Sequence, residues 1–141
     1  WQQNAEIIFS SNYGFYPDDN ILDLTVKDNT LIINQKFYSN SRHSDTSKLT
    51  FRFQNNDFYL IGSLSIFDDT FNYTLKNDLN FSTGKIIVDE EYSSCDDFAS
   101  VIQQDFYKVF THKFKSLIKM NRFKMNENKI KIPNSKKYIY Y

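Results

Sequence analysis

The segment KLTFRFQNNDFYLIG, residues 48–62, decides the fold. Its first half alternates between polar and apolar side chains, so Leu49, Phe51 and Phe53 share one face of a predicted strand. The residues from Gln54 to Asp57 then supply a turn, because Asn and Asp side chains bond their own backbone and tolerate left-handed geometry. A second apolar strand follows at once, and the segment therefore predicts a β-hairpin.

Most of the first 93 residues continue in the same way. Further strands are predicted at Ile21–Val26, Thr30–Tyr38, Phe58–Ile66, Thr70–Leu75 and Ile86–Val88. The polar stretch Ser39–Ser47 predicts a long exposed loop, and Gly62 indicates a bulge or a close backbone approach. Because turns rather than helices separate the strands, we expect an antiparallel β-meander over residues 1–93.

After residue 93 the apolar residues follow a helical spacing. Ser94 and Asp97 fit the Ser-x-x-Asp pattern of a capping box. Apolar side chains then recur every three or four positions, at Phe98, Val101, Ile102, Phe106, Val109, Phe110, Phe114, Leu117 and Ile118. This stripe predicts an amphipathic helix over residues 94–120, with its body from about Asp96 to Lys119. A basic C-terminal segment, 121–141, follows with short strands expected near Ile130 and Tyr138.

The predicted fold class is therefore α+β, in which the helix covers one face of the antiparallel meander. A chain of 141 residues corresponds to a single domain, residues 1–141. Each buried Phe of the helix is expected to contribute about 1.5–3 kcal/mol to stability. The substitution Phe110→Asp is therefore expected to unfold the domain.

Composition and charge exclude several classes of protein. Aromatic residues make up 18% of the chain, which excludes intrinsic disorder, and no apolar run is long enough for a membrane helix. A single Cys excludes an intrachain disulfide. The 17 basic and 17 acidic side chains are segregated: the net charge is −8 over residues 1–97 and +8 over residues 98–141. Either the two parts pack together, or one offers a charged face to a partner.

No motif in the sequence predicts catalysis, a metal site or a cofactor. His43 and His112 stand apart, without the spacing of zinc ligands, and no nucleophile elbow or complete phosphate loop is present. We therefore expect a non-enzymatic protein with no cofactor. Two alternatives stay open: a hydrolase with an unrecognised carboxylate pair, and a nucleic-acid binder that uses the basic C-terminal segment.

Two segments, LTFRFQNNDFYLIG at 49–62 and NFSTGK at 80–85, resemble a pattern in small, mostly uncharacterised exported proteins of Gram-negative bacteria. In that pattern a Phe-x-Phe strand, a polar turn and a Leu-Ile-Gly strand precede an Asn-x-x-Thr-Gly-Lys turn. The resemblance implies a β-rich protein of the cell envelope, often encoded beside secretion or toxin systems. It carries no catalytic residues. The lipid-attachment Cys of such proteins is absent here, so a lipid anchor is expected only on an N-terminal extension.

These observations lead to an expected function and location. We expect a protein-binding module of the bacterial envelope, in its sharpest form an immunity protein that neutralises a toxin encoded nearby. The chain starts at Trp1, which fits a cleaved export signal or an excised domain; the expected location is periplasmic or otherwise exported, with the cytoplasm as the alternative. The candidate partner contacts are Arg42, His43, Asp45, Asp68, Asp69, Asp89, Glu90 and Glu91.

Overall fold

The computed structural model describes residues 7–10, 12–93 and 103–141. Within these residues the regular structure is almost entirely β. In chain order the elements are η1 (Pro17–Asp19), β1 (Ile21–Lys27), β2 (Thr30–Tyr38), β3 (His43–Gln54), β4 (Asp57–Asp69), β5 (Tyr73–Asn80), β6 (Lys85–Tyr92), β7 (Phe106–Thr111), η2 (Met120–Arg122), β8 (Lys129–Lys131) and β9 (Tyr138–Tyr140).

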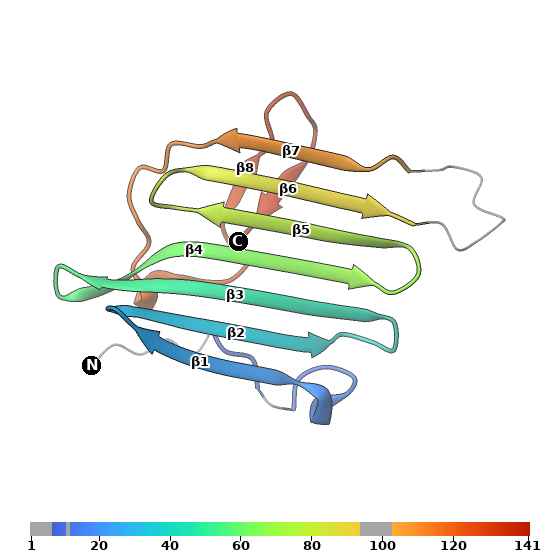
Figure 1. Ribbon diagram of the computed structural model, residues 1–141, viewed down its shortest axis with the longest axis horizontal. Coiled ribbons are helices and arrows are strands. Elements are labelled where there is room, and N and C mark those ends of the chain that lie inside the picture. Colours follow the sequence, from blue (N-terminus) through green and yellow to red (C-terminus); the bar gives the residue numbers. More distant parts are fainter. Residues whose placement is uncertain (1–6, 11, 94–102) are drawn as a thin grey trace.

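Strands β1 to β7 form one sheet, in which each strand is antiparallel to the strand that precedes it (Figure 1). The turns of two hairpins explain part of this order. In the β1–β2 turn, Asp28 and Asn29 have positive φ, and in the β3–β4 turn Asn55 and Asn56 do, with values between 48° and 61°. Two-residue turns with both φ angles positive match the twist of antiparallel strands, and Asn and Asp adopt them readily.

The central pair of strands departs from a regular ladder at one point. Thr50 lies opposite Gly62 but Phe51 lies opposite Leu60, so Ile61 is an extra residue in β4. Of the two alternatives predicted at Gly62, a bulge or a close backbone approach, a bulge is present at the adjacent Ile61. Strand β3 also begins earlier than expected, at His43, so the loop predicted over Ser39–Ser47 is wrong for its second half.

The α+β prediction is wrong, because the described part of the predicted C-terminal amphipathic helix, from residue 103 onward, contains a strand and no α-helix. Residues 94–102 lie outside the described residues, and Phe106–Thr111 form β7 instead. The longest helices among the described residues are 3₁₀ turns of three residues, and none of them could span a membrane. Phe106 and Phe110 are half-buried on one side of β7, while Tyr107 and Val109 are exposed on the other.

A spacing of four residues between apolar side chains does not distinguish a helix from a strand. It corresponds to about one turn of a helix but also to two pleats of a strand. The residues of β7, FYKVFT, are largely aromatic and β-branched, which favours a strand. Strand β6 offers an edge to which β7 bonds, and this pairing lies outside what local periodicity can reveal.

One face of the sheet, here called the inner face, is covered by residues 112–141. The C-terminal hairpin β8–β9 lies behind the sheet in Figure 1. Sheet residues and C-terminal residues share one core: Ile7, Ile33, Leu49, Phe51, Leu60, Leu79, Phe81, Ile86, Val88, Met120, Phe123, Ile130, Ile132 and Ile139. The opposite, open face carries no second layer within the described residues.

Ion pairs also join the basic C-terminal segment to the acidic sheet. Lys119 Nζ lies 2.7 Å from the Asp57 carboxylate, and Lys137 pairs with Glu90. The Leu60 N–H donates to the Ile118 carbonyl over 2.8 Å, so the backbone of this segment is also tied to β4. Part of the charge segregation is therefore neutralised inside the molecule.

Candidate functional site

A cavity of about 330 Å³ lies between the inner face and the C-terminal segment. Its floor is a row of short polar side chains on the three central strands: Ser47 of β3 lies opposite Ser65 of β4, which lies opposite Asn77 of β5. Ser63 adds a third serine to the floor. These side chains are too short to fill the space that Leu or Phe would occupy in a close-packed interior, and the cavity results.

Aromatic side chains form much of the cavity wall. Phe9 and Phe37 line one side, and Tyr138 and Tyr140 of β9 line another. The Phe9 and Phe37 rings lie 4.8 Å apart between centroids. The buried Gln35 fixes this wall, because its side chain accepts from the Phe9 N–H over 2.8 Å and donates to the backbone of residue 7. These two hydrogen bonds tie the backbone next to Phe9 to strand β2.

One carboxylate enters the cavity. Asp45 of β3 lies between Phe37 of β2 and Phe67 of β4 in the strand register. Burial raises the pKa of the Asp45 carboxyl, while a hydrogen bond with Ser39 and the electrostatic interaction with His43 act in the opposite direction. The groups around Asp45 therefore stabilise its negative charge only in part.

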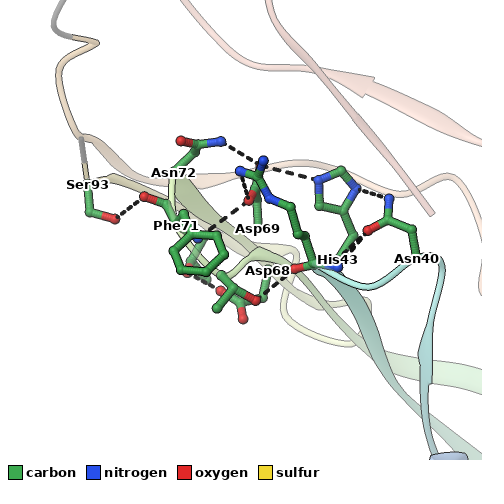
Figure 2. Close-up of polar contacts among 10 residues, drawn as sticks. Asn40, His43, Asp68, Asp69, Phe71, Asn72 and Ser93 are labelled. Atoms are coloured by element: carbon green, nitrogen blue, oxygen red, sulfur yellow. Dashed lines mark hydrogen bonds and ion pairs between the residues drawn. The ribbon is translucent and has the colours of Figure 1, made fainter. Parts of the chain in front are cut away.

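A second polar region lies beside the cavity, where the β2–β3 loop meets the β4–β5 turn. This corner cluster consists of Asn40, His43, Asp69, Phe71 and Asn72, which Figure 2 labels, together with Arg42. Asp69 is its centre and is only 6% exposed. Its carboxylate accepts from Asn72 Nδ2 over 2.9 Å and lies 3.3 Å from the Arg42 guanidinium and 3.2 Å from His43 Nε2. Three side-chain donors thus converge on one buried carboxylate, which also accepts from the Phe71 N–H over 3.4 Å.

The hydrogen bonds of Asn40 select the tautomer of His43. The Asn40 Oδ1 atom accepts from the backbone N–H groups of Arg42 and His43, each over 2.8 Å. Its Nδ2 group must then donate to His43 Nδ1, 2.8 Å away. With Nδ1 as the acceptor, the matching tautomer of His43 carries its proton on Nε2, which donates to Asp69.

The outer surface of the corner cluster is an Arg–aromatic pair. The Arg42 guanidinium lies 5.2 Å from the centroid of the Phe71 ring, which is a cation–π distance. Both side chains are about half exposed, Arg42 at 48% and Phe71 at 49%. The Thr70 N–H and hydroxyl both donate to the Arg42 carbonyl, over 3.1 and 2.8 Å, and hold the backbone beneath the pair.

The corner cluster predicts an acid-sensitive contribution to stability. The hydrogen bond from Asn72 is the largest of the contacts that hold the pKa of Asp69 below its usual value. A depressed pKa contributes stability above the pKa of the unfolded chain, about 3.9, which is lost as the pH falls through the folded value. We expect Asp69→Asn to lower the melting temperature at pH 7 and to lower it less at pH 3. Thermal unfolding across this pH range measures the difference. A deficit that stays constant with pH would contradict the assignment, and Asp78→Asn controls for the loss of one exposed acidic charge.

The structure brings together some of the candidate contact residues and separates others. Arg42, His43 and Asp69 meet in the corner cluster, and Asp45 lies next to it in the cavity wall. Asp68 points to the open face, where its carboxylate accepts from the Thr74 hydroxyl over 2.9 Å. Residues 42–45 are far from residues 68–69 in the sequence, and the β3–β4 register makes the two groups neighbours.

The three acidic residues of β6 divide between the two faces. Asp89 and Glu91 alternate with the inward residues and lie on the open face. Glu90 is buried on the inner face, where it pairs with Lys137 and accepts from the Tyr92 hydroxyl over 3.0 Å. Burial and the Glu90 carboxylate raise the pKa of Tyr92 to about 12. Glu90 is thus engaged within the fold.

No sequence motif indicates the floor of the cavity. A signal was present, because Ser47, Ser63 and Ser65 occupy inward positions beside apolar inward residues such as Leu49 and Phe67. Small polar side chains at such positions mark a place where a core is left unfilled. In the part of the chain that the structure describes, no three His, Cys, Asp or Glu side chains gather in a way that could hold a metal ion.

The sequence matches no protein-family model, and the chain has no match among curated proteins or solved structures.

Proposed function

We propose that the protein is a non-enzymatic protein-binding module of the bacterial cell envelope, and specifically an immunity protein that neutralises a secreted toxin. The observation that carries the proposal is the corner cluster. It presents an exposed Arg42 stacked on an exposed Phe71, above a buried network centred on Asp69. Arg and aromatic side chains are enriched among the residues that dominate protein–protein affinity.

The rigidity of the corner cluster supports this role. Arg42 is tethered through its side chain to Asp69 and through its carbonyl to Thr70. A side chain already held in one conformation loses little entropy on binding, so more of its contact energy appears as affinity. Exposed acidic side chains nearby, such as Glu91 on the open face, favour a partner with a basic surface and speed its association.

The location and the toxin rest on the resemblance to exported proteins of Gram-negative bacteria. That resemblance involves residues 49–62 and 80–85, which form the β3–β4 hairpin and the β5–β6 turn. It implies an envelope protein encoded beside a secretion or toxin system. The product of the adjacent gene is therefore the partner to test first.

We expect Arg42→Ala and Phe71→Ala each to weaken binding to that gene product at least about 10-fold, because both remove an anchor of the contact surface. Isothermal titration calorimetry measures the affinity, and survival of cells that express the toxin measures protection. Lys85→Ala is the matched control, since Lys85 is exposed at the opposite end of the sheet and should leave binding unchanged. If the wild-type protein neither binds the adjacent gene product nor protects cells, the immunity function is refuted.

A further inference from the structure

The cavity beneath the C-terminal hairpin adjoins the corner cluster at Asp45 but has its own lining and chemistry. Its volume of about 330 Å³ falls at the lower end of the range for small-molecule sites. Such sites combine apolar and aromatic walls with a few convergent polar groups. This cavity has that composition, with aromatic walls from the N-terminal region and β9 and a floor of hydroxyl and amide groups.

The described lining of the cavity carries negative charge only. Among the described residues that line the cavity, Asp45 has the only side chain that is charged at neutral pH. Asp45 also makes no ion pair with a Lys or Arg of the described residues, in contrast to Asp57, Asp69 and Glu90, which all have one. A half-buried carboxylate without a cation is costly, because it has lost part of its hydration.

The floor contains a hydroxyl group without a hydrogen-bond partner. The Ser47 Oγ atom is buried and has no hydrogen-bond partner in the structure. Ser47 is two residues from Asp45 on β3, so both side chains lie on the same face of the strand. Buried hydroxyl groups are nearly always hydrogen-bonded in folded proteins, and this atom is therefore placed to bond a ligand.

We propose that the cavity binds a small organic cation, in which a protonated amine lies against Asp45 and an apolar or aromatic body lies between the Phe9–Phe37 wall and the β9 tyrosines. The ammonium group supplies the missing counter-charge and can donate to Ser47. The aromatic rings contribute through contact area and, at Phe37 and Phe67 on either side of Asp45, through cation–π attraction. An anionic ligand would meet Asp45 as an uncompensated like charge.

The test uses three probes of similar size: 2-phenylethylamine, the neutral 2-phenylethanol and the anionic 3-phenylpropionate. NMR titration at pH 7 follows the backbone amide signals of Ser47, Ser65 and Asn77. We expect the amine to shift these signals to saturation with a dissociation constant on the order of 1 mM or tighter, as ligand efficiency allows for a compound of this size. The alcohol should bind at least 10-fold more weakly, and the acid should not bind. Equal binding of amine and alcohol, or no shift of the floor signals by the amine, would overturn the proposal.

Variants then test the role of the carboxylate. Asp45→Asn should reduce amine affinity to that of the alcohol, while Asp78→Asn, on the open face, should leave it within twofold. Ser65→Leu fills the floor and should abolish amine binding while Asp45 is retained. Undiminished amine binding by Asp45→Asn would refute the assignment. If the Asp45→Asn variant does not fold, the comparison of the three probes on the wild-type protein and the Ser65→Leu variant still test the proposal. None of these measurements depends on Arg42 or Phe71, so the outcome is independent of the proposed protein partner.

Discussion

Replacement of Phe51 by Ala is expected to lower the free energy of unfolding by about 3–5 kcal/mol. Phe51 is 0% exposed, and its ring lies 6.2 Å from that of Phe123 in an edge-on arrangement. The variant leaves a cavity between the sheet and the C-terminal segment, and neither element can collapse into it without losing other contacts. Urea denaturation followed by circular dichroism measures the change as a lower midpoint.

Phe53→Ala is the matched control. Phe53 is two residues further along the same strand and faces the same side, but it is 42% exposed and contacts the ring of Phe58 at the β3–β4 turn. We expect this substitution to cost no more than about 1.5 kcal/mol, since much of the side chain already lies in water. Equal costs for the two variants would show that the C-terminal segment does not cover β3 as described.

The second large effect is expected at Gly84. Its φ is +77°, and a Cβ built on it would lie 2.3 Å from the carbonyl oxygen of His112. That oxygen belongs to the backbone just after β7, and the His112 N–H donates to the Gly84 carbonyl over 2.9 Å. Gly84→Ala therefore strains the left-handed residue and pushes β7 away from the β5–β6 turn. We expect a loss of about 2–4 kcal/mol in the free energy of unfolding.

Gly62→Ala provides the comparison within the same sheet. A Cβ at Gly62 would meet the Thr50 side chain at 3.6 Å, an ordinary van der Waals distance. The expected change is below about 1 kcal/mol, because the added methyl also restricts the unfolded chain. Thermal unfolding of both variants should separate them clearly. Similar melting temperatures for the two would show that the close approach at Gly84 is not a constraint.

The sequence predicted the hairpins well because their causes are local. Asn55 and Asn56 adopt left-handed geometry by their own chemistry, and the alternation in Lys48–Gln54 needs no distant partner to be recognised. The helix prediction failed for a related reason. The four-residue spacing of Phe106 and Phe110 fits both a helix and a strand, and the composition of β7 together with its pairing to the edge of β6 selects the strand.

The candidate sites show the same division. Arg42, His43 and Asp69 are candidate contact residues in the sequence because they lie in polar stretches near predicted turns. The β3–β4 register then places them together. The sequence did not predict the cavity, because a single serine on a strand gives no indication of an unfilled core. Only the cross-strand alignment of Ser47 with Ser65 turns them into a floor.

The amino-acid sequence alone determined where the chain turns and which side chains of each strand share a face, because φ/ψ preferences and a period of two are properties of neighbouring residues. The tertiary structure decided which of those faces is buried. Leu22, Leu24 and Val26 on β1 follow the same alternation as Leu49 and Phe51 on β3, yet they are more than half exposed while the β3 pair is buried. Burial depends on the path of residues 112–141 across the inner face, and that path is set by long-range packing and ion pairs rather than by any local pattern.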